Sequence, residues 1–262
     1  MIDILVLVDF TETADRSVAQ AISIAMDKGG KITVCHIAGS KTEDEATTEK
    51  LKPYLQVIEK EGISCKSLVG HGNLYKEAAS IADHTQPDLI IVGTHGVKGL
   101  KQNIFGANIY KLVSGLSIPS LVVNDHARTV KGGYKKVLMP VAHHLEYLNK
   151  VKQTSKLIAK DGKIVIFSIA KPGLELDAEV KKNITESQNW LNENGINWEY
   201  QEVSSTKYSL GYAKETLAAI SDQKIDLISI ITNISEQSAL FGKMDKENLL
   251  VNQIGLQVLC TV

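Results

Sequence analysis

The sequence is poor in aromatic residues and has neither an excess of one charge nor a long hydrophobic run. Phe, Trp and Tyr make up 5% of the 262 residues, so aliphatic side chains must dominate the core. The 29 basic and 30 acidic side chains lack the basic excess of a nucleic-acid binder. The apolar start, Ile4–Val8, is far shorter than the ~20 residues that span a bilayer. We therefore expect a cytoplasmic protein that binds neither nucleic acid nor membranes.

Signatures of several other protein classes are also missing. The three cysteines, Cys35, Cys65 and Cys260, are odd in number and lack metal-type spacing, so we expect small buried thiols, without disulfides or a metal site. No Gly-Lys-Ser or Gly-Lys-Thr occurs, which excludes a conventional P-loop NTPase. The Gly-His-Gly fragment at 70–72 lacks the third glycine of a dinucleotide fingerprint.

What the sequence does contain is an internal repeat. Segments of the first half recur in the same order in the second: Lys31–Ala38 resembles Lys163–Ala170, Gly62-Ile63 recurs as Gly195-Ile196, Lys76–Ala78 as Lys214–Thr216, and Asp88–Ile90 as Asp226–Ile228. The length also suits two domains at ~100 to 200 residues each. The repeat predicts domains at residues 1–127 and 134–262, joined by a short exposed linker with the glycine pair 132–133.

Within each copy, short apolar runs alternate with helical patterns, as in βαβ units around a parallel sheet. We expect strands at 4–8, 32–37, 63–69, 89–92 and 120–123, and at 137–141, 163–169, 196–203, 227–231 and 257–262. Helices of the first copy are expected at 13–28, 43–60, 74–84 and 107–116. The predicted fold class is α/β, with two tandem five-stranded, doubly wound parallel-sheet domains. Each last strand is an apolar edge, so we expect self-association of these edges, between copies or between chains.

A glycine-rich loop follows the expected fourth strand. Gly93 and Gly96 enclose Thr94, and Gly106 opens the next helix. The first two glycines permit positive φ and let main-chain amides approach an anion, and the helix start adds unpaired N–H donors. Lys98 adds positive charge. The loop therefore predicts a phosphate site.

Asp9 lies at the carboxyl end of the first strand, where an acidic group commonly binds the ribose or base of a nucleotide. If the first and fourth strands are neighbours, Asp9 and Gly93 face one pocket. The alternative is that Asp9 contributes to the cap of the following helix, although Thr11 and Thr13 already offer caps.

At these residues both halves of the sequence together resemble a tandem member of the universal stress protein family. The resemblance rests on Val8–Glu12, the spacing of Gly93, Gly96 and Gly106, and Ile118–Val123. It implies an adenine nucleotide alpha hydrolase-like fold with strand order 3-2-1-4-5 and dimer-like pairing through the fifth strands. It also implies binding of ATP or another adenine nucleotide, with or without Mg. The predicted cofactor-binding residues are Asp9, Phe10, Ile37, Gly93, Thr94, Gly96, Lys98, Gly106, Ala107 and Asn108.

One position departs from the family. Its ATP-binding members usually carry Ser or Thr after the last glycine, where this chain has Ala107. A hydrogen bond to a charged phosphate is worth ~1.5 to 3 kcal/mol, or roughly tenfold to more than a hundredfold in affinity. Asn108 is the candidate substitute, and we expect weakened nucleotide binding rather than none.

The second copy lacks the glycines. The repeat puts Ile231, Ile234 and Met244 at the positions of the three loop glycines, and Ala142 at that of Asp9. Asp245, at the position of Ala107, would repel phosphate and is a candidate cap of its own helix; Glu236 nearby adds to the repulsion. We expect this copy to be a packing partner, a sensor surface or a site for a different ligand.

Three functions fit these patterns. The first is a stress-response regulatory protein in which nucleotide binding to the first copy alters association. The second is slow ATP hydrolysis or phosphoryl transfer, for which only Asp9 offers a base or metal ligand. The third is an interaction scaffold without nucleotide. We expect no catalytic residue: His95 and the pair His143-His144 are polar loop residues, and neighbouring strand positions such as Cys35-His36 point to opposite faces.

Overall fold

The computed structural model describes residues 1–40, 44–94, 106–141, 143–144, 146–205, 213–221, 223–232 and 243–262. The first half contains β1 (Ile2–Leu7), α1 (Glu12–Lys28), β2 (Gly30–Ala38), α2 (Asp44–Lys60), β3 (Ser64–His71), α3 (Leu74–Thr85), β4 (Leu89–Thr94), α4 (Gly106–Ser114) and β5 (Ser120–Asn124). The second half contains β6 (Tyr134–Pro140), α5 (Tyr147–Ser155), β7 (Ile158–Ala170), α6 (Ala178–Glu193), β8 (Asn197–Ser204), α7 (Ala213–Ile220), β9 (Leu227–Ile231), α8 (Lys243–Leu250) and β10 (Gln257–Thr261).

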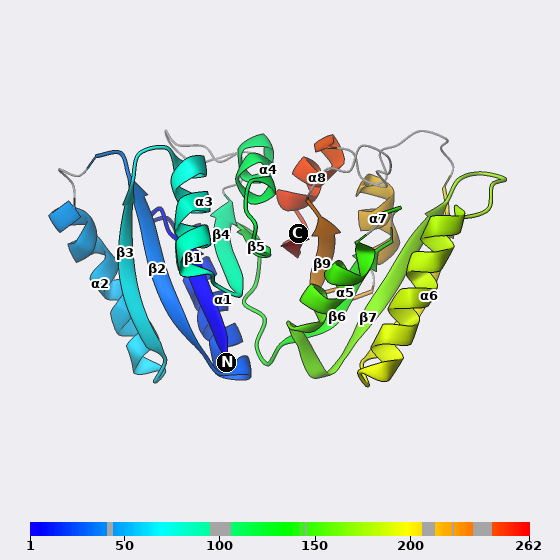
Figure 1. The fold of residues 1–262 in the computed structure, drawn as a ribbon, viewed down its shortest axis with the longest axis horizontal. Coiled ribbons are helices and arrows are strands. Elements are labelled where there is room, and N and C mark those ends of the chain that lie inside the picture. The colour runs from blue at the N-terminus through cyan, green and yellow to red at the C-terminus, as the bar shows by residue number, and fades with distance from the viewer. Residues whose placement is uncertain are drawn as a thin grey trace.

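These strands form a single sheet in the order β3-β2-β1-β4-β5-β10-β9-β6-β7-β8. The first half has the predicted order 3-2-1-4-5 with parallel neighbours, and the second half repeats it. Figure 1 shows the halves side by side, with α2 at one end of the molecule and α6 at the other. The α/β fold class predicted from the repeat is therefore confirmed.

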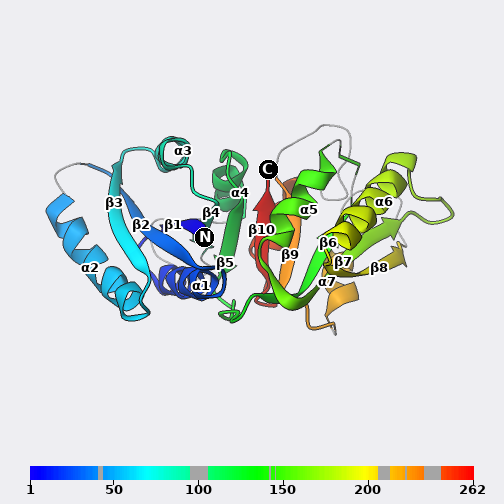
Figure 2. The same ribbon diagram turned by 60° about the horizontal axis from the view of Figure 1, so that its bottom comes forward.

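The two fifth strands meet each other. β5 and β10 pair antiparallel, with Val122 opposite Val258, and lie next to each other at the middle of the molecule (Figure 2). Polar side chains reinforce the junction: the Gln257 amide donates to Gln20 Oε1 at 2.9 Å, and the Tyr134 hydroxyl donates to Gln257 Oε1 at 2.6 Å. Of the two expectations for the apolar edges, pairing between the copies is what the structure shows.

Alternate strand residues face opposite helix layers. In β1, Ile4 and Val6 pack into the core beneath α1, α2, α5 and α6, whereas Leu5 and Leu7 pack into the core beneath α3, α4, α7 and α8. Both cores are almost entirely aliphatic, which accounts for the low aromatic content. The central strands β4, β5, β9 and β10 are therefore buried on both faces, as the unbroken apolar runs predicted, whereas the edge strands β3 and β8 are partly exposed, so the expectation is wrong for them.

Two local features differ from the sequence-based expectations. β7 begins at Ile158 rather than at residue 163, because Ile158 pairs with Tyr134 ahead of a register shift. The charged residues at this point interrupt the apolar pattern, so the sequence did not indicate the earlier start. The connection between the halves contains exposed residues but is held at Val130, whose carbonyl accepts from the Gln20 amide at 3.2 Å and the Ser23 hydroxyl at 2.7 Å. The connection is therefore fixed against α1.

Candidate functional site

The carboxyl ends of β1, β2 and β4 border a pocket of about 320 Å³ in the first half. Its apolar lining comes from strand residues that face the α3–α4 layer and from the walls of α3 and α4: Leu7, Cys35, Ile37, Val92, Leu74, Tyr75 and Leu112. Its more polar lining includes Asp9, His36, Gly39, Gly72, Asn73, Gly93 and Asn108. The pocket lies where the strand order reverses, because β1 pairs with β2 on one side and with β4 on the other.

The structure brings four of the predicted site residues together in this pocket, namely Asp9, Ile37, Gly93 and Asn108. The first and fourth strands are neighbours, with Leu7 paired to Val92, as the argument from Asp9 required. Gly106 begins α4 as expected, and Ala107 follows it. Gly96 and Lys98, like His95, lie outside the described residues.

Phe10 and Thr94 do not line the pocket. Phe10 has a left-handed φ of 63°, and its ring centroid lies 4.5 Å from that of His36 and 6.4 Å from that of Tyr54 on α2. Thr94 is buried at the end of β4. The predicted position of Phe10 in the site is therefore replaced by a packing role on the α1–α2 side of the sheet.

Asp9 is exposed at the pocket and also supports the helix start behind it. Its Oδ1 atom accepts from the Thr11 hydroxyl at 2.5 Å and from the Thr11 amide at 3.3 Å. Thr11 is the N-cap of α1 and accepts from the Ala14 amide. The carboxylate therefore supports the helix cap, as the alternative for Asp9 expected, and it also borders the pocket, where its role in binding stays a prediction.

Gly93 serves a purpose that the loop pattern did not indicate. The φ of Gly93 is not positive, so the expectation of a positive φ is wrong at this position. A Cβ atom built on Gly93 would lie 2.9 Å from Thr13 Cγ2 and 3.1 Å from Ser17 Oγ. The glycine is needed because α1 crosses directly over the end of β4, and this crossing brings the start of α1 close to the pocket.

Cys35 and His36 face opposite sides of the sheet, as expected. Cys35 is fully buried, and burial together with the charge of Glu77 raises the pKa of its thiol to about 12. His36 Nδ1 lies 2.7 Å from the Val8 carbonyl oxygen and so donates to it, which ties the ends of β1 and β2 together. Neither group is placed as an activated nucleophile.

Sequence reasoning missed the wall formed by the start of α3. Asn73 is the N-cap of α3 and accepts from the Tyr75 and Lys76 amides, and Gly72 precedes it with a φ of 98°. The Lys111 ammonium of α4 lies 4.4 Å from the centroid of the Tyr75 ring. The signal was the Gly-His-Gly fragment at 70–72, which is no dinucleotide fingerprint but does shape the turn into this wall.

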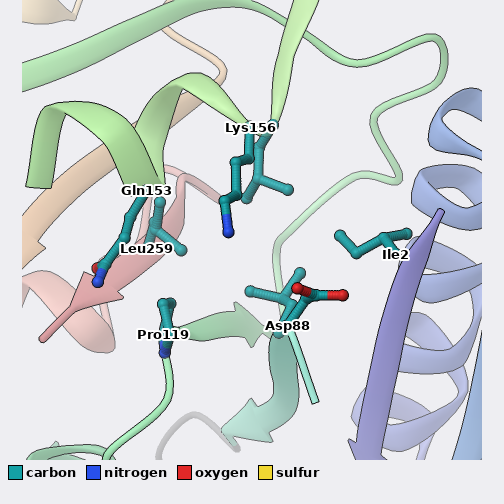
Figure 3. A pocket seen from close by; sticks show the side chains of 8 residues that line it. Ile2, Asp88, Pro119, Gln153, Lys156 and Leu259 are labelled. Carbon is teal, nitrogen blue, oxygen red and sulfur yellow. The ribbon is translucent and has the colours of Figure 1, made fainter. Parts of the chain in front are cut away.

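A second, much smaller cavity of about 10 Å³ lies between the halves, near the start of β1. Figure 3 shows Ile2, Asp88 and Pro119 on one side of it and Gln153, Lys156 and Leu259 on the other. It has room for about one water molecule. The pocket at the carboxyl edge is therefore the better candidate for a ligand.

In the second half, Ile231 ends β9 at the repeat position of Gly93. Asp245 is the third residue of α8 and so lies within the first turn rather than at the cap that we expected. Ala142, Ile234 and Glu236 lie outside the described residues. Within the described ranges, no group of three His, Cys, Asp or Glu side chains is placed to hold a metal ion. None of the helices described there has both the length and the hydropathy of a membrane span.

The sheet and pocket define the class of protein: two joined α/β domains of one doubly wound fold, with a ligand-sized pocket at the carboxyl edge of the first. Residues 3–124 match the model of the universal stress protein family. The first domain is thus a universal stress protein domain by its sequence, and the second domain repeats the same strand order.

Solved structures agree with this assignment at the level of the fold. A universal stress protein from Archaeoglobus fulgidus DSM 4304 is 15% identical, with coverage of 99% of this chain and 95% of that chain and a TM-score of 0.70. A functionally unknown protein from Pseudomonas aeruginosa PAO1 is 14% identical, with coverage of 99% and 92% and a TM-score of 0.62. No curated protein matches the sequence. At these identities the likeness establishes the tandem architecture.

Proposed function

We propose that the first domain binds an adenine nucleotide, with ATP as the leading candidate, and that the protein is a regulatory binding protein of the stress response rather than an enzyme. The observation that carries this proposal is the pocket of about 320 Å³ at the reversal of strand order, bordered by Asp9 and Gly93. Pockets of ~300 to 1,000 Å³ are typical of small-molecule sites, and nucleotides bind doubly wound sheets at this edge.

The lining suits the parts of a nucleotide in turn. The apolar surface of Ile37, Val92 and Leu112 suits a flat base, and the Asp9 carboxylate can accept hydrogen bonds from ribose hydroxyls. The first turn of α4 begins at Gly106 and contains the pocket residue Asn108, and the N-terminus of a helix suits phosphates. A bound Mg²⁺ would arrive with these phosphates.

A regulatory role is supported by the helix that would hold the phosphates. α4 also contacts the second domain: the Tyr110 hydroxyl donates to the Thr232 carbonyl oxygen at 3.3 Å. A nucleotide that fixes the start of α4 would therefore act on a helix that both domains share. The output of binding would be a change in the contact between domains and in the association that depends on it.

The proposal is tested by calorimetry with ATP, ADP and AMP, with and without Mg²⁺. The wild type should bind at least one of them, and Asp9→Ala should bind it at least about tenfold more weakly, because a charged hydrogen bond is lost. Asp161→Ala, which removes an exposed carboxylate of β7, is the matched control and should bind as the wild type does. Absence of heat in the wild type would refute the proposal. Hydrolysis above the buffer rate that Asp9→Ala abolishes would move the protein to the enzyme class.

A further inference from the structure

The α3 wall of the pocket contains a side-chain amide with a fixed orientation. Asn73 lines the pocket and is the N-cap of α3. Its Oδ1 atom accepts from the Tyr75 amide at 3.1 Å and from the Lys76 amide at 3.2 Å. These two backbone donors determine which end of the amide faces the helix, because the NH₂ end could not accept from them. Nδ2 is therefore the end that faces away from the helix.

The Nδ2 atom of Asn73 keeps its two N–H groups for a ligand. Among the described residues, it donates to no other protein group, and the residue is exposed. The pocket residues Gly39 and Gly72 lie close to it along the wall, and a Cβ atom at either would have no contact within 4 Å beyond its chain neighbours. This part of the pocket therefore has open space beside an oriented donor.

The wall that carries Asn73 is held against the end of β2. The Gly72 amide donates to the Ala38 carbonyl oxygen at 2.9 Å, and Ala38 lies between the pocket residues Ile37 and Gly39. The Asn73 carbonyl oxygen in turn accepts from the Glu77 amide at 2.9 Å. A donor that is ordered before the ligand arrives adds little to the entropic cost of binding.

The order of the strands determines which part of a nucleotide reaches Asn73. In the order β3-β2-β1-β4, Asp9 after β1 lies between Asn73, which follows β3, and α4, which follows β4. A nucleotide with its ribose at Asp9 and its phosphates at the start of α4 extends its base toward Asn73. The ring nitrogen N1 of a purine lies on the edge farthest from the ribose, so this edge is the one that meets the wall.

We propose that Asn73 determines the base specificity of the pocket by donating a hydrogen bond from Nδ2 to the ring nitrogen N1 of adenine. In adenine this nitrogen carries a lone pair and accepts, whereas in guanine it carries a hydrogen and opposes one donor with another. A donor left unpaired in a site is costly, which is how a binding site rejects the wrong base. The inference rests on the proposed nucleotide site and adds the residue that selects the base.

The donor is tested with Asn73→Asp, which replaces Nδ2 by an acceptor. The variant keeps the helix cap, because aspartate caps helices as well as asparagine does, so its unfolding midpoint should match or exceed that of the wild type. Calorimetry should show that the wild type binds ATP more tightly than GTP. In the variant the carboxylate repels the lone pair of adenine and accepts from the ring N–H of guanine. The ratio of the two affinities should therefore shift toward GTP at least about tenfold.

Two further variants separate the donor from charge and from the cap. Asn73→Ser keeps an N-cap oxygen but has no amide donor, and it should weaken ATP binding about three- to tenfold without adding charge. Asn197→Asp makes the same chemical change as Asn73→Asp at an exposed residue of β8, and it should leave both affinities unchanged.

The failures of the two proposals are distinguishable. A wild type that prefers GTP, or an Asn73→Asp variant with the wild-type ratio of affinities, would overturn the role of Asn73 while nucleotide binding stands. A wild type that binds neither nucleotide would overturn the proposed function and the role of Asn73 together.

Discussion

The close crossing of α1 over β4 makes Gly93→Ala an informative substitution. The new methyl group would lie 2.9 Å from Thr13 Cγ2 and 3.1 Å from the Thr13 carbonyl carbon, so either the side chain or the helix must shift. Overpacking of this kind costs ~1 to 3 kcal/mol. The loss of backbone freedom in the unfolded chain returns ~0.4 to 1 kcal/mol. We expect a net loss of about 1 to 2 kcal/mol, measured as a lower urea midpoint at unchanged m-value.

A double-mutant cycle isolates the contact. Thr13→Ser removes Cγ2 but keeps the hydroxyl that donates to Asp125 Oδ1 at 2.6 Å, so Gly93→Ala with Thr13→Ser should recover part of the loss. Equal stability of Gly93→Ala and the wild type would refute the packing argument. An alanine that weakens ATP binding at full stability would show that the glycine serves the ligand instead.

Two further predictions concern the two domains. The low pKa of Lys150 means that the unfolded state binds more protons than the native state between that lowered pKa and the ordinary lysine value of 10.5, so this residue should make stability rise with pH across that interval. The rise should be missing from Lys150→Met when denaturant midpoints are compared across pH, and parallel profiles would contradict it. Ala107→Ser should tighten ATP binding about tenfold or more by restoring a hydroxyl to the helix start, and calorimetry that finds the wild-type affinity would place the phosphates elsewhere.

Much of the architecture could be predicted because it depends on local patterns. Aliphatic runs such as Ile4–Val8 and the recurrence of Lys31–Ala38 at Lys163–Ala170 were sufficient for the strands and the repeat. The apolar character of the last strands predicted that their edges pair, but it left open whether they do so between the copies or between chains. These features need no knowledge of which side chains meet.

The details of the site depend on contacts between distant segments and could not be predicted in the same way. The loop pattern assigned Gly93 to an anion, whereas its Cβ position is closed by Thr13, which is eighty residues earlier in the chain.

The antiparallel pair of β5 and β10 lets the two halves diverge. In a homodimer joined through the same edge, each mutation would appear on both sides of the seam and in both sites. Here one half can keep a glycine at the end of its fourth strand while the other carries isoleucine. The peptide connection also holds the edges together at any dilution, since their encounter is intramolecular. The chain thereby joins two similar halves in a single asymmetric molecule.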